Sequence, residues 1–348
     1  MRWLVTGCCG FLGSHLCKYI SKNTSNDIIG IDKLSYCSSL KNIEGIERFK
    51  FIQADFCDYN FVKYILESEK PDVIFHIGAY THVDNSFNSS LEFTYNNVYG
   101  THVILELCRE LHISKLIHMS TDEVYGSVPD GEKADENSKL DPTNPYSVSK
   151  ACAESIIETY ISNFNLNVIR VRCNNLIGTH QFVEKLIPKF ILRLLRGDKC
   201  CIHGNGKNTR NFTDVKEVCR GLVLIAEKSE KNEIWNIGVN EEYSVNDITH
   251  LLISSLNKLI LEQPVLFTSM QVKHLQQNYA DLIEYVPDRI FNDTRYTMST
   301  DKIKSKLGFE INQDIEHIIQ DVCLWYVKNQ NYYNGNDIIR YTQPHCKM

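Results

Sequence analysis

Two short motifs in the middle of the chain carry side chains that could do acid and base chemistry. The first is Thr121-Asp122-Glu123, which directly follows an apolar run. The second is the pair Tyr146 and Lys150, which stand four residues apart. Residues at this spacing share one face of a helix, so the ammonium would lie beside the phenol and lower its pKa from about 10 toward neutrality. Together the two motifs could move protons to and from a substrate.

Each motif also has an ordinary structural explanation, since such i, i+4 pairs occur by chance and an Asp-Glu pair is often a solvated turn. The elements around them favour chemistry. The apolar run 116–119 predicts a buried strand, which places Asp122 just beyond the strand's carboxyl end, where open α/β sheets bind ligands. Asn144 and Pro145 predict an N-cap and a first helical residue, so that a helix begins at about Tyr146.

A glycine-rich turn near the N-terminus predicts a dinucleotide site. An apolar strand at 3–6 is followed by glycines at 7, 10 and 13 and then by an amphipathic segment. Glycine permits the tight turn and the close approach of a pyrophosphate, which the free N–H groups of a helix N-terminus would bind. A second apolar strand ends at Asp32, whose carboxylate would accept hydrogen bonds from the adenosine ribose and repel a 2′-phosphate. We therefore expect NAD rather than NADP.

Two later strand ends add cofactor candidates. Asp55 and Phe56 could hold the adenine edge or form an ordinary turn, and Ala79 lies where a cofactor could pass close to the backbone. The full set that we expect to bind NAD is Gly7, Gly10, Phe11, Gly13, Asp32, Asp55, Phe56, Ala79, Tyr146 and Lys150.

Strand and helix signals alternate through the first half of the chain and predict an α/β fold with a Rossmann-type doubly wound parallel sheet. The alternation loosens after Arg172, which predicts a smaller mixed α/β substrate-binding region built from C-terminal insertions. We expect the NAD-binding domain at 1–176, with 211–238 and about 296–326 returning to it, and the substrate-binding region at 177–210 and 239–295. No function is assigned to the tail at 331–348.

Composition excludes several classes of protein. The 348 residues are 43% hydrophobic and 23% charged, as in ordinary globular proteins. A net charge of -6 without a Lys/Arg-rich run argues against a nucleic-acid partner. Neither a signal peptide nor an 18-residue apolar stretch is evident, so we expect a cytoplasmic protein without a membrane partner. The 13 cysteines include no Cys-x-x-Cys spacing, and we interpret them, including the adjacent pairs Cys8-Cys9 and Cys200-Cys201, as reduced structural thiols without a metal.

The motifs taken together resemble the extended short-chain dehydrogenase/reductase family, and within it the nucleotide-sugar 4,6-dehydratases of the dTDP-glucose or UDP-glucose type. The resemblance extends to about residue 326. It departs from the family pattern at Thr213-Asp214, where an apolar residue and an aromatic residue or histidine are usual. Its motifs are the glycine turn, Tyr146 to Lys150, Arg172 to Asn175, His82 to Asp84, Ser120 to Gly126, Glu184 to Pro188, and Asp288 to Tyr296. The Asp122-Glu123 pair separates the dehydratases from the family's 4-epimerases and decarboxylases.

This resemblance implies conversion of UDP-glucose or dTDP-glucose to the 4-keto-6-deoxy sugar and water, an early step in rhamnose-type deoxysugar biosynthesis, with NAD as a resident cofactor. Tyr146 would take the C4 hydroxyl proton, with Lys150 and Thr121 beside its oxygen. Glu123 would remove the C5 proton and Asp122 would protonate the departing C6 hydroxyl.

The resemblance also implies a homodimer and a set of substrate-binding residues. These are His82, Ser86, Asn175, Glu184, Lys185, Arg210, Arg289, Arg295 and Tyr296. Two alternatives stay open: a 4-epimerase or a dehydratase that also epimerises C5, and a non-catalytic NAD(H)-binding regulator, which would not need all five catalytic residues. The choice between UDP and dTDP also stays open.

Overall fold

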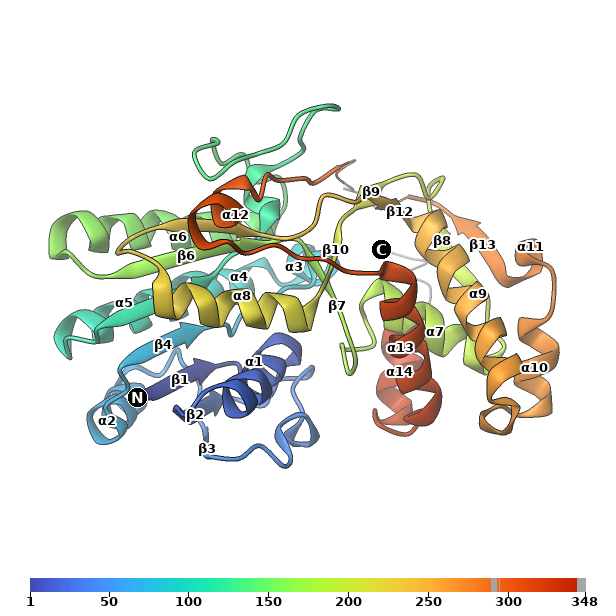
Figure 1. Cartoon of the computed structure of the whole chain (residues 1–348), viewed down its shortest axis with the longest axis horizontal. Helices are drawn as coiled ribbons and strands as arrows, with labels where there is room; N and C mark the ends of the chain where they lie inside the picture. The colour runs from blue at the N-terminus through green and yellow to red at the C-terminus, as the bar shows by residue number, and fades with distance from the viewer. Residues whose placement is uncertain (289–292, 294, 343–348) are drawn as a thin grey trace. The chain divides into compact units, whose positions relative to one another are not determined.

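The computed structural model describes residues 1–288, 293 and 295–342. The chain forms two compact units, and each is described by itself (Figure 1). The first consists of Met1–Asn174, Val215–Asn240 and Tyr296–Ile311. The second consists of Asn175–Asp214, Glu241–Arg295 and Asn312–Met348.

A seven-stranded parallel sheet forms the centre of the first unit. Its strand order is β11-β6-β5-β4-β1-β2-β3. The chain runs outward in opposite directions from β1 and β4, so the switch point where doubly wound sheets bind ligands lies between these two strands. The predicted fold class is confirmed. The strands are β1 (Arg2–Thr6), β2 (Asp27–Asp32), β3 (Phe49–Gln53), β4 (Val73–His76), β5 (Lys115–Met119), β6 (Val168–Cys173) and β11 (Ile234–Ile237).

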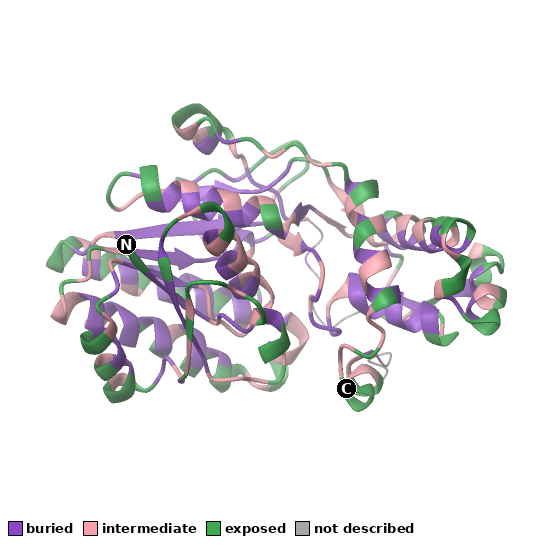
Figure 2. Ribbon diagram, turned by 60° about the horizontal axis from the view of Figure 1, so that its bottom comes forward, coloured by how far each residue is buried: buried purple, intermediate pink, exposed green. Residues whose placement is uncertain are grey.

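Helices cover both faces of this sheet. On one face, α2 (Tyr59–Glu69), α5 (Gly100–Glu110) and α6 (Pro145–Phe164) share a buried apolar cluster with strand residues such as Leu4 and Leu116. On the other, α1 (Phe11–Asn23) packs against α8 (Val215–Lys228). Because side chains alternate along a strand, sheets covered on both faces need the continuous apolar runs seen in the sequence. Figure 2 shows most of these strands buried, whereas the edge strand β3 is partly exposed.

Shorter elements complete the first unit. They are the 3₁₀ turns Leu40–Ile43 and Asp122–Tyr125, α3 (Val83–Asn88), α4 (Ser90–Phe93), a π-helical segment at Thr94–Tyr99, and α12 (Asp301–Leu307).

The second unit is smaller and mixes helices with three two-stranded sheets. The sheets pair β7 with β10, β8 with β13, and β9 with β12, and the last pair is antiparallel. The strands are β7 (Asn175–Ile177), β8 (Cys200–His203), β9 (Thr209–Arg210), β10 (Phe212–Asp214), β12 (Tyr243–Ser244) and β13 (Ile283–Val286). The helices are α7 (Leu186–Arg196), α9 (Val245–Glu262), the 3₁₀ turn Pro264–Leu266, α10 (Ser269–Leu275), α11 (Tyr279–Leu282), α13 (Ile315–Lys328) and α14 (Gly335–Thr342).

Four segments lie in a different unit from the one that the sequence predicts, and two of them, 175–176 and 239–240, are shifts of a domain boundary by two residues. Residues 312–326 were expected to return to the sheet domain, but α13 packs against α9 and α7. Residues 211–214 were expected there too, but β10 pairs with β7. An apolar helical stripe predicts a buried face without naming its partner, which explains the error. The tail supplies α14, which packs against α7.

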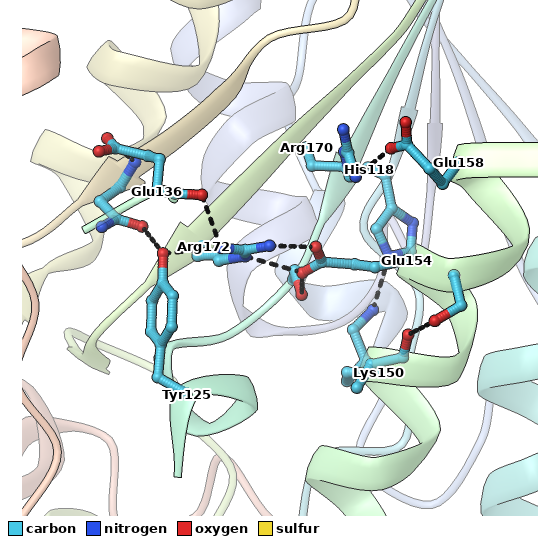
Figure 3. A network of polar contacts seen from close by, with 12 residues as sticks. His118, Tyr125, Glu136, Lys150, Glu154, Glu158, Arg170 and Arg172 are labelled. Atoms are coloured by element: carbon cyan, nitrogen blue, oxygen red, sulfur yellow. Dashed lines mark hydrogen bonds and ion pairs between the residues drawn. The ribbon is translucent and has the colours of Figure 1, made fainter. Parts of the chain in front are cut away.

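A buried ion pair attaches α6 to the ends of two strands. The helix begins as predicted, because the Asn144 side chain accepts a hydrogen bond from Ser147 N at 2.9 Å. Two turns further, the Glu154 carboxylate accepts hydrogen bonds from the Arg172 guanidinium on β6 at 3.0 and 2.6 Å (Figure 3). Ser120, directly after β5, donates to the same carboxylate at 2.6 Å. The ion pair therefore fixes α6 against both strand ends.

Two glutamates one turn apart on α6 allow a matched test of this ion pair. Glu154 and Arg172 are at most 3% exposed, whereas the Glu158 side chain, which pairs with Arg170, is 55% exposed. Glu154→Gln leaves the Arg172 charge buried without a counter-charge and should lower the free energy of unfolding by about 3–5 kcal/mol. Glu158→Gln should lower it by less, because the carboxylate that it removes is 55% exposed, although its partner Arg170 is buried. Urea unfolding followed by circular dichroism measures both, and equal losses would contradict the analysis.

Candidate active site

The two predicted carboxylates lie at the carboxyl end of β5 in different surroundings. Thr121 caps the short 3₁₀ turn by accepting from Glu123 N at 3.3 Å. Asp122 is buried, and its carboxylate accepts from Asn174 Nδ2 at 3.1 Å and from the Thr121 hydroxyl at 3.3 Å. Glu123 is partly exposed, and its carboxylate accepts from Asn144 Nδ2 at 3.0 Å. Two adjacent carboxyls with different burial and different donors can be held in different protonation states.

Tyr146 and Lys150 lie one turn apart on α6, as predicted, and both side chains are buried. The Thr121 side chain lies close enough to the Tyr146 hydroxyl to lower the pKa of the phenol. The Lys150 ammonium donates to His118 Nε2 at 3.3 Å, as Figure 3 shows. Thr121 therefore joins the acid pair to the phenol, because its hydroxyl contacts both.

The pKa of Tyr146 differs from the expectation. Burial raises it, the charges of Glu123 and Asp122 raise it further, and the hydrogen bond to Thr121 lowers it only in part. The expected lowering by Lys150 is not met in this structure, in which the ammonium is directed to His118. Burial lowers the pKa of Lys150 to about 8, although Glu154 opposes this shift. Because its pKa is raised, Tyr146 is a neutral phenol at neutral pH.

The glycine turn between β1 and α1 has the shape that a dinucleotide requires. Gly7 has a φ of +68°, and a Cβ there would lie 2.6 Å from Gly78 Cα at the end of β4. A Cβ on Gly13 would lie 2.1 Å from Gly7 O. A residue larger than glycine at position 7 or 13 would therefore collide with the backbone of this turn, which lies at the switch point of the sheet. Gly10 is the N-cap residue of α1, and Phe11 is its first residue.

Asp32 is the last residue of β2, and Asp55 follows the adjacent strand β3. Asp32 is 5% exposed and accepts from Cys9 N at 3.0 Å and from Leu34 N at 2.8 Å. Asp55 pairs with Lys33 at 3.4 Å. Phe56 is buried against Gly78 and Gly100, whereas Ala79 is partly exposed. A nearby pocket of about 310 Å³ is lined by Lys33, Tyr80, Leu91, Glu92, Tyr95 and Asn96.

Three of the predicted substrate residues lie in the first unit. His82 caps α3, and its Nδ1 accepts from Asn85 N at 3.3 Å. Ser86 has no exposed surface, and its hydroxyl donates to Val83 O at 2.6 Å. Tyr296 is also buried.

Five others lie in the second unit. Arg210 donates to Asp293 O at 2.9 Å, and Arg295 forms a bidentate ion pair with Glu242, with distances of 2.6 and 2.8 Å. Asn175 begins β7, Glu184 is buried, and Lys185 is the N-cap residue of α7. Arg289 lies outside the described residues.

The structure adds residues around the catalytic set that the motifs did not identify. Asn144 was predicted only as a helix cap, yet its amide also holds Glu123. His118 was predicted only as part of a strand, yet it receives the Lys150 ammonium. Neither contact has a signal in the sequence, because each joins positions more than 20 residues apart.

A doubly wound sheet that carries this glycine turn and this Thr, Tyr and Lys arrangement defines the extended short-chain dehydrogenase/reductase class. Comparison with known proteins narrows the assignment. The chain belongs to the nucleotide-sugar 4,6-dehydratase family, since the family profile described as GDP-mannose 4,6 dehydratase matches residues 4–322. The predicted family is confirmed.

Relatives over the whole chain agree with this assignment. A dTDP-D-glucose 4,6-dehydratase from Homo sapiens is 41% identical over 347 residues, which cover 99% of this chain and 94% of that protein. A trifunctional UDP-glucose 4,6-dehydratase, 3,5-epimerase and reductase from Arabidopsis thaliana is 38% identical over 99% of this chain and 50% of its own length. The crystal structure of DesIV, a dTDP-glucose 4,6-dehydratase from Streptomyces venezuelae with NAD and TYD bound, matches with a TM-score of 0.87 at 30% identity and covers 96% of this chain and 99% of that one.

Within the described part of the chain, every helix is too short or too polar to cross a membrane.

The buried lysine gives a pH-dependent prediction for the protein without ligands. The folded pKa of Lys150, about 8, lies below the ordinary value of 10.5, so the unfolded chain binds more protons between these pH values and wild-type stability rises with pH there. Relative to Lys150→Met, the wild-type chain should gain on the order of 3 kcal/mol between about pH 7 and about pH 10.5. Urea unfolding of both proteins across this range measures the gain, with Lys133→Met at an exposed position as control. A constant difference would show that Lys150 keeps its ordinary pKa.

Proposed function

We propose that the protein converts UDP-glucose or dTDP-glucose to the corresponding 4-keto-6-deoxy sugar and water, with NAD as a resident cofactor. The observation that carries this proposal is the pair Asp122 and Glu123, which differ in burial and in hydrogen-bond donors and are linked through Thr121 to the Tyr146 phenol. Family membership and the names of the relatives support the reaction and both nucleotides.

The first unit has groups that suit NAD. Gly7, Gly10 and Gly13 would admit the pyrophosphate, the Asp32 carboxylate would bind the adenosine ribose, and Asp55 and Phe56 would lie toward the adenine. When bound, NAD accepts a hydride from C4 of the sugar and later returns it to C6. The remaining steps belong to the side chains of the protein.

Tyr146 would act as the base for the C4 hydroxyl. A buried neutral phenol must first lose its own proton, and a nearby cation favours the phenolate. Lys150 is that cation, since a pKa of about 8 keeps it protonated at neutral pH. We infer that its ammonium turns from His118 toward Tyr146 when substrate and cofactor are bound. Thr121 would donate its hydroxyl proton to the same phenolate oxygen.

Asp122 and Glu123 would carry out the elimination. Oxidation at C4 makes the C5 proton acidic, and the partly exposed Glu123 is suited to remove it as a carboxylate. Asp122 would be the acid that donates a proton to the C6 hydroxyl as water leaves; for this, its burial, which disfavours the charged form, must outweigh the two hydrogen bonds that its carboxylate accepts.

We propose that the remaining residues bind the nucleoside diphosphate sugar. His82, Ser86, Asn175, Glu184 and Tyr296 would bind polar groups of the sugar and nucleoside, and Lys185, Arg210 and Arg295 would provide positive charge for the diphosphate. Arg295 would meet the diphosphate with its charge already partly balanced by Glu242. Arg289 was predicted for the same purpose.

The product distinguishes this reaction from its alternatives. Incubation with UDP-glucose and with dTDP-glucose, separately and in deuterated water, should give a 4-keto-6-deoxy sugar with one deuterium at C5, because Glu123 exchanges its proton with solvent. Mass spectrometry and NMR identify the product and the labelled carbon. A C4 epimer without deuterium would indicate the 4-epimerase, and no turnover of either substrate would favour the NAD(H)-binding regulator.

Variants of the acid pair separate oxidation from elimination. Glu123→Gln and Asp122→Asn should still allow oxidation at C4 but slow product formation by about 10²–10⁴-fold, since each removes one proton-transfer group. Reduced cofactor should therefore accumulate, as measured by its absorbance in stopped flow. Glu132→Gln, at an exposed position, controls for the loss of a carboxylate. Wild-type rates in both variants would make the pair an ordinary acidic turn.

We also propose that the protein is a cytoplasmic homodimer without a nucleic-acid or membrane partner. The net charge of -6 and the absence of a Lys/Arg-rich run support the exclusion of nucleic acid. Sedimentation equilibrium of the purified protein tests the dimer, which a monomer mass would exclude.

A further inference from the structure

Two adjacent thiols lie inside the glycine turn of the first unit. Cys8 and Cys9 follow Gly7, and neither has any exposed surface. Their Sγ atoms are 3.8 Å apart. The Asp32 carboxylate lies beside them, and one ligand atom from each of the three residues lies within 4.8 Å of the other two. The proposed function gives the two thiols no part.

Neighbouring strands hold these three groups together. A Cβ on Gly30 of β2 would lie 2.6 Å from Cys8 Sγ, so this glycine provides the space for the thiol. The Asp32 carboxylate at the end of β2 accepts hydrogen bonds from Cys9 N, from Leu34 N and from the Ser38 side chain. A carboxylate has about four lone-pair positions, so one remains for a further ligand.

The spacing of the sulfur atoms matches one edge of a tetrahedral metal site. A zinc ion binds thiolate sulfur at about 2.3 Å in tetrahedral geometry, which places two sulfur ligands about 3.8 Å apart. Within the described residues, this is the one group of three cysteine, histidine, aspartate or glutamate side chains that is close enough to share an ion.

The other adjacent cysteine pair provides a contrast within the same chain. Cys200 and Cys201 lie on β8 in the second unit, where neighbouring side chains point to opposite faces of the strand. Their thiols contact separate backbone carbonyls, those of Phe190 and Lys199. Adjacency in the sequence alone therefore does not bring two thiols together.

We propose that the cofactor-free protein binds one thiophilic divalent cation of the zinc and cadmium class through Cys8 Sγ, Cys9 Sγ and an Asp32 oxygen. Binding replaces the two thiol protons, which leave to solvent, with two metal–sulfur bonds and changes no oxidation state. Because the same carboxylate is proposed to hold the adenosine ribose, the cation and NAD exclude each other. This second part rests on the proposed function, whereas metal binding does not.

The burial of the site determines how the cation enters. Both thiols are fully buried, so the glycine turn must open before an ion can reach them. Binding to the cofactor-free protein should therefore be slow. In the NAD-bound protein, the pyrophosphate would lie against the turn and hinder its opening.

Cadmium titration of the full-length, reduced protein tests the proposal, because the charge-transfer absorption of cadmium–thiolate bonds counts bound thiolates without reference to activity. Cofactor-free wild type should bind one two-thiolate Cd²⁺ that Cys8→Ala/Cys9→Ala lacks. The matched variant Cys200→Ala/Cys201→Ala should keep it. Cys9→Ala alone should halve the absorption at this site, and Asp32→Asn should weaken binding by at least about tenfold. Circular dichroism confirms that each variant is folded.

Each result has one meaning. If Cys8→Ala/Cys9→Ala binds as much cadmium as the wild type, the metal is adventitious and the site is overturned. If the wild type binds cadmium at Cys8 and Cys9 and added NAD displaces it, both parts of the proposal hold. If NAD binds by calorimetry without displacing cadmium, the metal site stands and mutual exclusion through Asp32 is overturned. If NAD does not bind at all, the metal site still stands and the proposed cofactor is wrong.

Discussion

The ion pair between Arg172 and Glu154 determines where the catalytic side chains stand. A buried ion pair adds little net stability over apolar packing, because desolvation offsets the attraction, but each charge severely limits where the other can go. Tyr146, Lys150 and Glu154 occupy successive turns on one face of α6. Fixing the last of them against β6 therefore fixes the other two. Since Ser120 donates to the same carboxylate, the acid pair that follows Ser120 is positioned by the same contact.

The burial that makes this positioning possible also sets the protonation of the site. Removal of water disfavours every charged form, so it raises the pKa of Tyr146 and lowers that of Lys150, and both groups move toward neutrality. A dry phenol beside two carboxylates is a poor base without added positive charge. The arrangement therefore suits a reaction that begins only with substrate bound and with the Lys150 ammonium turned toward Tyr146, since the phenolate becomes accessible at that point.

Local patterns predicted most of the first unit. The strands β1 to β5 were predicted from their apolar runs, which strands covered on both faces require, and the start of α6 followed from Asn144 and Pro145. The errors concern partners. The apolar stripe of α13 fits more than one neighbour, and the sequence assigned it to the wrong unit. The contacts of Lys150 with His118 and of Glu123 with Asn144 join distant positions, so no spacing rule could have found them.

The cysteines also show that sequence spacing does not detect contacts between distant residues, and here this limit affects the expectation of a protein without a metal site. Spacing motifs such as Cys-x-x-Cys detect only metal ligands that lie close together in the sequence. A chain without such a motif is therefore predicted to have no metal site. In the parallel register of β1 and β2, Thr6 lies opposite Ile31, so the residues that follow both strands meet at the same edge of the sheet. Two thiols after β1 and a carboxylate at the end of β2 thus become neighbours although 23 positions separate Cys9 from Asp32. Gly30 then decides the outcome, because any side chain there would occupy the space of the Cys8 thiol.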